Sequence, residues 1–185
     1  MANDSSEVRL APTGIVYVAP VGTAAPTDAT TVLNAAFLPL GYVADGGVTA
    51  QPKIATNDIM AWQSMLPVKT TLKSIGLTLK FNLLQVNGAT SALYFFGQSW
   101  TVSATPTLTV SSNPSTDFRA LVIEWTDDIG KSYRLYIPKG LVTDRDNLVI
   151  DRNSATAYGV TFEALDSNGT FMQMFTNNLN LNVNS

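Results

Sequence analysis

The stretch SIGLTLKFNLLQVN, Ser74 to Asn87, decides the fold of this chain. Its apolar and polar residues alternate, which is the period of a β-strand with one buried face and one solvated face. The apolar positions are Ile75, Leu77, Leu79, Phe81 and Leu83. Globular strands usually run about five or six residues, whereas this strand would span roughly 40 Å if it continued to Val86. Its length is the feature that the rest of the sequence has to explain.

Length and composition predict one domain, residues 1–185. The chain has 185 residues, of which 45% are hydrophobic, enough for a single core. It contains no cysteine and no histidine, which excludes a disulfide framework, a thiolate metal site and an imidazole base. We therefore expect no enzyme and no cofactor. The N-terminal residues have no basic segment before an apolar run, so we expect neither a signal peptide nor a membrane span.

The charge balance is sparse and slightly acidic. Eleven basic residues are set against 14 acidic ones, for a net charge of −3, and the basic residues are scattered. Specific affinity for nucleic acid needs clustered Lys and Arg, so this distribution argues against it. Between Leu10 and Ala44 the only charged residue is Asp28. We interpret this region as a partner-contacting segment that follows an N-terminal arm (1–13), with a flexible leader as the alternative.

Turn and alternation signals predict about eight strands and one short helix. The expected class is mainly β, a two-sheet β-sandwich or partial barrel with a long arm and a long loop. The helix is predicted from Asn87, which can cap its start, to Gly97, which can end it. Residues 118–128 and 131–140 should form a hairpin that places Leu121, Ile123 and Trp125 near Tyr133, Leu135 and Ile137. A second hairpin is predicted at Asn168-Gly169.

The last residues, 176–185, are predicted to form an uncharged edge strand. Asparagine alternates there with Leu179, Leu181 and Val183. Terminal edge strands normally carry lysine, proline or a bulge that prevents chain-to-chain pairing. We expect this strand to pair with another copy, and the alternative is that it caps its own sheet.

Several stretches together resemble the major tail tube proteins of long-tailed bacteriophages (siphophages), especially those of actinobacterial hosts. PTGIVYVAPVGTAAPTDATTVLNAAFLPLGYVADGGVT, Pro12 to Thr49, is similar to the N-terminal signature of that family. DIMAWQS followed by the long strand is similar to its middle, and YRLYIPKGLVTDRDNLVIDRNSATAYGVTFEAL resembles its closing hairpins. The resemblance covers Pro12 to Asp166. Some relatives carry a C-terminal immunoglobulin-like domain, which we do not expect here.

The resemblance implies a self-assembling structural protein. Such proteins form hexameric rings that stack into a tube, and each subunit lends strands to a barrel around the lumen. A barrel of about twenty-four strands would be wider than the sixteen to eighteen strands of porins and could pass DNA. Thr78, Lys80 and Asn82 are then the candidate lumen-facing residues, and we expect a carboxylate near Lys80 to offset its charge.

The resemblance also implies partners and a location. The chain would bind itself, the tape measure protein inside the tube, and the tail terminator and the distal tail or baseplate proteins at the tube ends. Double-stranded DNA would pass without specific binding during ejection, and no membrane is involved. The protein would be made in the cytoplasm of the bacterial host and would reside in the virion tail.

Residues 48–72 form a long hairpin or loop in this prediction, and the family uses a loop at this position between rings. It exposes Ile59, Met60, Trp62, Met65 and Leu66, which are residue types typical of interfaces. We assign these five, with Leu179, Leu181 and Val183, as candidate contacts between subunits. The alternative is a flap folded over the subunit's own sheet.

Other functions remain as alternatives. A carbohydrate-binding β-sandwich module could use Trp62, Trp100 or Trp125 as stacking platforms. Asp144, Asp146 and Asp151 lack the glycine and the bidentate glutamate of a calcium loop, so we interpret them as a solvated turn.

Overall fold

The computed structural model describes residues 7–181 and shows one antiparallel sheet of eight strands with a short α-helix. The strands are β1 (Thr13–Pro20), β2 (Leu38–Pro39), β3 (Val43–Met60), β4 (Pro67–Leu83), β5 (Arg119–Thr126), β6 (Ser132–Arg145), β7 (Tyr158–Ala164) and β8 (Gln173–Thr176). The helices are α1 (Gly88–Tyr94) and the 3-10 turn η2 (Leu179–Leu181). The strand order is β2-β1-β5-β6-β7-β4-β3, and β8 pairs with β6.

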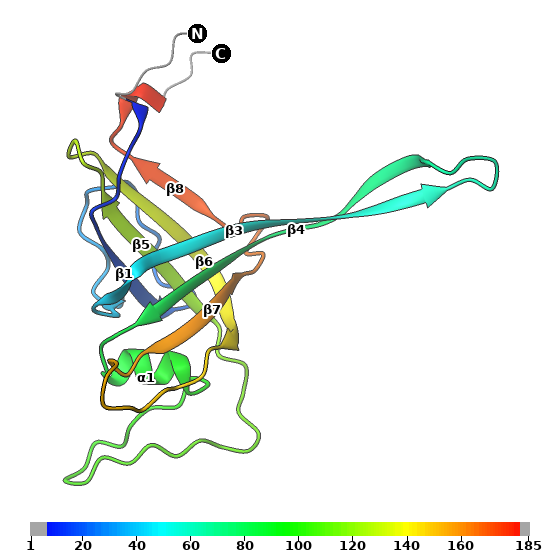
Figure 1. Cartoon of the computed structure of the whole chain (residues 1–185). Helices are drawn as coiled ribbons and strands as arrows, with labels where there is room; N and C mark the ends of the chain where they lie inside the picture. The colour runs from blue at the N-terminus through cyan, green and yellow to red at the C-terminus, as the bar shows by residue number, and fades with distance from the viewer. Residues whose placement is uncertain (1–6, 182–185) are drawn as a thin grey trace.

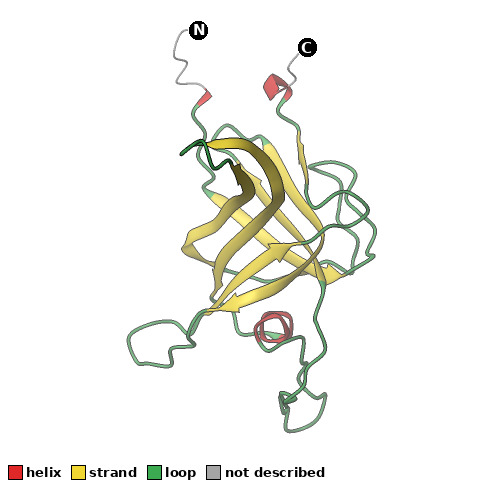
Figure 2. Ribbon diagram, turned by 90° about the vertical axis from the view of Figure 1, so that its right-hand side faces the viewer, coloured by secondary structure: helices red, strands yellow, loops and turns green. Residues whose placement is uncertain are grey.

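This architecture confirms the predicted mainly β class with one short α-helix. The strands form one continuous sheet that curls over its core without closing, so the partial barrel is the form that the chain adopts (Figure 2). The β3–β4 hairpin extends far beyond the rest of the sheet (Figure 1).

The core lies on the concave side of the curled sheet and explains the alternation in the long strand. Leu77, Leu79, Phe81 and Leu83 of β4 are all buried. They pack in one cluster with side chains from β1, β5, β6, β7 and α1, among them Val16, Leu121, Ile137, Phe162 and Leu93. The apolar face of the long strand is therefore a core face, as predicted, from Leu77 onward. Ile75 is the exception, because it lies outside the core and is 57% exposed.

A second, smaller apolar cluster covers the opposite face of the sheet. It joins Ala19, Ala120, Val122 and Tyr136 to Phe37, which follows the loop between β1 and β2. The near-uncharged region from Leu10 to Ala44 therefore contains an interior strand and a loop that pack on the chain's own sheet. The interpretation of that whole region as a partner-contacting segment was wrong for these residues, because their apolar side chains already have partners.

The β5–β6 hairpin confirms the predicted register. Leu121 lies opposite Ile137, Ile123 opposite Leu135, and Trp125 opposite Tyr133. The Trp125 and Tyr133 rings are stacked, with centroids 5.3 Å apart. The turn is held by the buried carboxylate of Asp127, which accepts hydrogen bonds from the backbone N–H groups of Ile129 (3.1 Å) and Lys131 (2.7 Å).

The predicted hairpin at Asn168-Gly169 is only half right. Both residues have positive φ, 56° and 81°, as a tight two-residue turn requires, and Ser167 and Thr170 form an isolated bridge. However, β7 and β8 do not pair with each other: β7 pairs with β4 and β6, and β8 pairs with β6. Turn chemistry is local, whereas the partner of each flanking strand is set by the rest of the sheet.

The predicted helix is confirmed at its start. The Asn87 side chain accepts hydrogen bonds from the N–H groups of Ala89 and Thr90, both 2.9 Å, and the Thr90 hydroxyl accepts one from the Asn87 N–H. This is a capping box. The chain leaves the helix through Phe96 (φ 56°) and Gly97 (φ 78°). No helix in the described part of the chain is long and apolar enough to cross a membrane.

Candidate assembly surfaces

The largest candidate surface is the projecting hairpin, residues 52–77 of β3 and β4. Strand β4 is paired on both sides only from Thr78 to Leu83, where β3 and β7 flank it. From Pro67 to Leu77 it pairs with β3 alone, and β3 pairs with no other strand in the described residues. The long strand is thus an interior strand at its C-terminal half and part of a two-stranded ribbon at its N-terminal half. Its unpaired edge is confined to the ribbon.

The two faces of the projecting hairpin differ in chemistry. Directly opposed residues of an antiparallel pair lie on the same face. The pair Ile54 and Ile75 comes next on the face that holds the core residue Leu77 and its exposed partner Pro52. Leu72 follows on the same face. The side chains of Ile54, Ile75 and Leu72 are 72%, 57% and 64% exposed. The core face therefore continues onto the ribbon as an uncovered apolar strip.

The opposite face of the projecting hairpin is polar and basic. Lys53 lies opposite Gly76, and Lys69 lies opposite Ile59. The same face leads into the sheet through the pairs Gln51–Thr78 and Thr49–Lys80. Sequence reasoning missed both Lys53 and Lys69, because residues 48–72 were predicted only as a long hairpin or loop without a strand register. Proline is tolerated in an edge strand, and the alternation from residue 48 to 59 was the available signal.

The tip of the hairpin carries the predicted contact residues fully exposed. Trp62 is 99% exposed, Met65 97% and Leu66 75%, while Ile59 and Met60 just before the tip are about half exposed. The tip has a defined turn, since the Ser64 N–H donates to the Ala61 carbonyl at 3.1 Å and the Ser64 hydroxyl donates to the Leu66 carbonyl at 2.9 Å. The alternative of a flap folded over its own sheet was wrong, because the hairpin projects away from the body (Figure 1).

The candidate lumen-facing residues do not share one environment. Lys80 and Asn82 are exposed, whereas Thr78 is only 6% exposed and its hydroxyl has no hydrogen-bond partner among residues 7–181. Thr78 was expected on a solvated face, but it is buried at the first position of β4 that has a paired strand on both sides, between Gln51 of β3 and Glu163 of β7. The predicted carboxylate beside Lys80 is confirmed, since Asp146 Oδ1 lies 2.9 Å from the lysine Nζ.

The C-terminal prediction was wrong in its secondary structure. Leu179 and Leu181 lie in a 3-10 turn, not in a strand, although both are exposed at 75% and 58%. Val183 lies outside the described residues. The strand near the C-terminus is β8, and it pairs with β6, so this part of the chain extends its own sheet. The Asn177 side chain also accepts a hydrogen bond from the Ser132 N–H at 2.9 Å.

The N-terminal arm docks at the same end of the sheet. The Leu10 carbonyl accepts a hydrogen bond of 3.2 Å from the Asp128 N–H, and the Arg9 Nε lies 3.4 Å from the Asp127 carboxylate. The described part of the arm is therefore attached to the β5–β6 turn.

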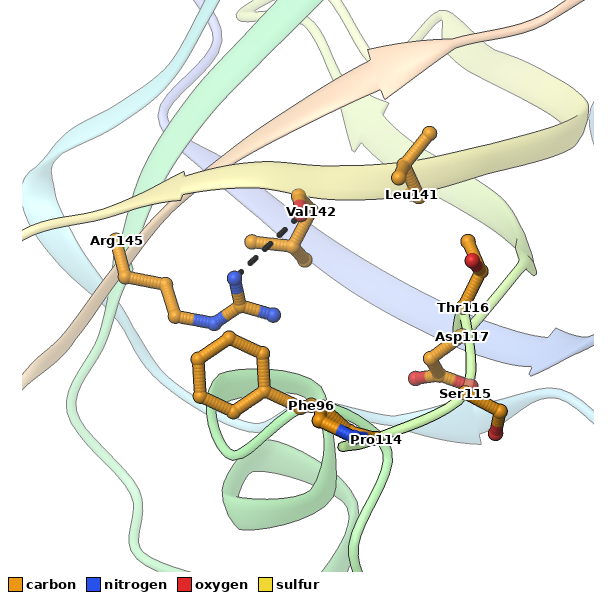
Figure 3. Close-up of a pocket in the computed structure, with 8 residues that line it drawn as sticks. All are labelled: Phe96, Pro114, Ser115, Thr116, Asp117, Leu141, Val142 and Arg145. Atoms are coloured by element: carbon orange, nitrogen blue, oxygen red, sulfur yellow. Dashed lines mark hydrogen bonds between the residues drawn. The ribbon is translucent and has the colours of Figure 1, made fainter. Parts of the chain in front are cut away.

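A pocket of about 220 Å³ lies between the end of β6 and the segment that precedes β5 (Figure 3). Its walls include Leu141 and Val142 on one side and residues 114–117 on the other. The Arg145 guanidinium lies 4.1 Å from the centre of the Phe96 ring and donates through Nη1 to the Val142 carbonyl at 3.5 Å. Partial burial lowers the pKa of Arg145 from its ordinary value. No group of three or more acidic side chains in the described chain is arranged to hold a metal ion.

The described residues thus include an exposed apolar hairpin tip and backbone edges without partner strands. A family model described as phage tail tube protein matches residues 1–183, and the chain belongs to this family. It is thus a structural protein of the phage virion tail, which confirms the resemblance found in the sequence.

No curated protein matches the chain. Among solved structures, a chain of the anti-feeding prophage baseplate, determined by cryo-electron microscopy with six-fold symmetrisation, has a TM-score of 0.49 and 10% sequence identity over 95% of this chain and 97% of that chain.

Proposed function

We propose that this protein forms hexameric rings that stack into the tail tube, and that the tube conducts DNA during ejection into the host. The observation that carries the proposal is the projecting hairpin, which has free backbone edges and a fully exposed apolar tip in a chain of the tail tube family. Unpaired edges and large exposed apolar side chains are unfavourable for a monomer and favour association.

The hairpin tip is the proposed contact between rings. Trp62, Met65 and Leu66 stand far from the subunit's own core, so they can reach a neighbouring copy. Aromatic and methionine side chains are enriched in interfaces, where they bury a large area. In the assembled tail, the tape measure protein would occupy the lumen, and the tail terminator and the distal tail or baseplate proteins would bind the two ends.

The lumen is proposed to lie along the face that carries Lys80 and Asn82. The charge of Lys80 is already offset by Asp146, which leaves it less able to hold a phosphate. A wall without strong net positive charge would let DNA slide rather than bind.

The carbohydrate-binding alternative has less support. Trp62, Trp100 and Trp125 lie on the hairpin tip, the loop between α1 and β5, and strand β5, and Trp125 is stacked on Tyr133. The family match favours the structural role.

Electron microscopy of the concentrated protein tests the proposal. We expect six-fold rings and tubes from the wild-type chain. Trp62→Ser with Met65→Ser should abolish tubes while leaving the thermal unfolding midpoint of the monomer unchanged, because both side chains are already in water. Val32→Ser, at a 91% exposed position on another loop, is the matched control and should assemble normally. Purified protein that stays monomeric at all concentrations would contradict the proposed function.

A further inference from the structure

The sulfur chemistry of this chain lies entirely in its methionines. The sequence has five methionines and no cysteine, so a peroxide, which oxidises thiolates and thioethers, finds only thioether sulfurs to attack. Oxidation turns a flexible apolar side chain into a polar sulfoxide, and dedicated reductases reverse the change. The consequence for the protein depends on where each methionine lies.

The methionines of the described chain differ widely in exposure. Met65 is 97% exposed, whereas Met60 and Met174 are 56% and 53% exposed. Met172 is partly buried and packs against the main core cluster. Because the sulfur must meet the oxidant in solvent, Met65 should react first and Met172 last.

Met65 lies in the turn between β3 and β4, at the far end of the projecting hairpin (Figure 1). Ser64 organises this turn. Its N–H donates to the Ala61 carbonyl at 3.1 Å, and its hydroxyl accepts a hydrogen bond of 3.2 Å from the Leu66 N–H. The backbone around Met65 is therefore held in place while its side chain stays in solvent, as do those of Trp62 and Leu66. The most oxidisable sulfur of the described chain thus belongs to its exposed apolar tip.

We propose that Met65 is a sulfoxidation site that controls assembly: a peroxide oxidises its thioether in the free subunit, and the sulfoxide keeps the hairpin tip from binding another copy. A lone pair of the sulfur forms the new S–O bond as the O–O bond of hydrogen peroxide breaks, and the second oxygen leaves as water. The sulfoxide oxygen needs a hydrogen-bond partner, so its burial in an apolar contact is unfavourable. Assembly in turn shields the sulfur. The inference rests on the proposed role of the tip as a contact between copies.

Fractionation of partly oxidised protein is the first test and needs no variant. Wild-type subunits are treated briefly with dilute hydrogen peroxide, concentrated until tubes form, and separated from the tubes by sedimentation. Peptide mass spectrometry should find the Met65 sulfoxide depleted at least about tenfold in the tubes, because its oxygen lacks a partner in the contact. The Met174 sulfoxide should be evenly distributed, since Met174 lies on β8, which pairs with β6. An even distribution of the Met65 sulfoxide would overturn the inference.

Substitution of Met65 is the second test. Leucine keeps the size and the apolar character of methionine but has no sulfur. The readout is the tube yield after peroxide relative to the yield of the same variant before peroxide. This relative yield should fall strongly for the wild type and for the matched control Met174→Leu, and it should stay constant for Met65→Leu. Equal losses in Met65→Leu and the wild type would mean that another site is responsible.

Reversal is the third test and separates the modification from general damage. Methionine sulfoxide reductases for both sulfoxide epimers, supplied with a thiol reductant, should return oxidised wild-type protein to its original tube yield. Each reduction gives the thioether, water and the disulfide of the reductant. Circular dichroism of the oxidised protein should match that of the untreated protein. A yield that stays low after the sulfoxide has been reduced would contradict the proposed control.

The outcomes separate this inference from the proposed function. Absence of tubes from untreated wild-type protein would overturn the proposed function. Tubes that form equally well from subunits with the Met65 sulfoxide would overturn only the control by oxidation.

Discussion

At the scale of single residues, a few polar side chains hold the loop between β1 and β2 against the sheet. Arg134, 3% exposed, donates through Nε to Glu124 at 2.6 Å and through its terminal nitrogens to the carbonyls of Thr31, at 2.8 Å, and of Asp28. Asp28 organises the same turn by accepting hydrogen bonds from the Thr30 N–H at 2.7 Å and the Thr31 N–H at 2.6 Å. The loop that covers Tyr136 and Val122 thus depends on a buried arginine and an ionised aspartate.

The pH dependence of this turn is a prediction at residue scale. The hydrogen bond from the Thr31 hydroxyl, followed by those from the Thr31 and Thr30 N–H groups, holds the pKa of Asp28 well below its ordinary value. Because the folded-state pKa is depressed, the stabilising contribution is fully present above the unfolded value, about 3.9, and is lost only as the pH falls through the lower folded value. The amide NMR signals of Thr30 and Thr31 should therefore stay fixed down to about pH 4 and move at lower pH. A titration midpoint near the ordinary aspartate value would refute the turn geometry, and Asp28→Asn should remove the transition.

At the scale of elements, local signals were predictable and non-local pairing was not. The register of the β5–β6 hairpin followed from alternation on both sides of a short turn, and the helix start followed from Asn87. The partners of β7 and β8 did not follow, because β6 is long enough to pair with β8 near its start, at Tyr133–Tyr136, and with β7 near its end. The asparagine and leucine alternation after residue 177 predicted a strand, but the described residues there form the 3-10 turn Leu179–Leu181 instead.

The apolar strip on the projecting hairpin gives a prediction at element scale. The triple variant carries Ile54→Thr, Leu72→Thr and Ile75→Thr. Threonine is β-branched and favours strands, so the strand preference of the hairpin is retained. All three side chains are exposed in the monomer, so the free energy of unfolding should change by no more than about 0.5 kcal/mol per site. Tube assembly should be lost if the strip is buried between copies. Chemical denaturation measures the free energy of unfolding, and sedimentation measures tube assembly. Val110→Thr, in the exposed loop between α1 and β5, is the control for both measurements. Normal tube yield from the triple variant would show that the strip stays in solvent.

At the scale of the whole molecule, most of the described chain forms a body whose central strands are paired on both sides, and the β3–β4 hairpin projects from it with an unpaired edge. Central strands such as β5 are paired on both sides and buried on both faces, with Ala120, Leu121 and Val122 all inaccessible. Strand β3 has one paired side, and most of its residues are exposed. The sequence indicated this division through the length of the strand that ends at Leu83. It could not show that the free edge belongs mainly to β3, because that depends on which side of β4 receives β7.

Hydrogen exchange should reveal the same division directly. Amide protection follows the free energy of local opening, which is low where few buried contacts hold the backbone. In the unassembled chain, amides of β5 should exchange slowly, and amides from Val48 to Met60 should exchange faster by at least two orders of magnitude. On assembly, the β3 amides should become as protected as those of β5, because strand pairing with another copy would supply the missing acceptors, while β5 should not change. Mass spectrometry of peptides from the free and assembled protein measures both. Persistent fast exchange of β3 in finished tubes would mean that this edge remains open to water, and the tube would then have to be held together by the hairpin tips alone.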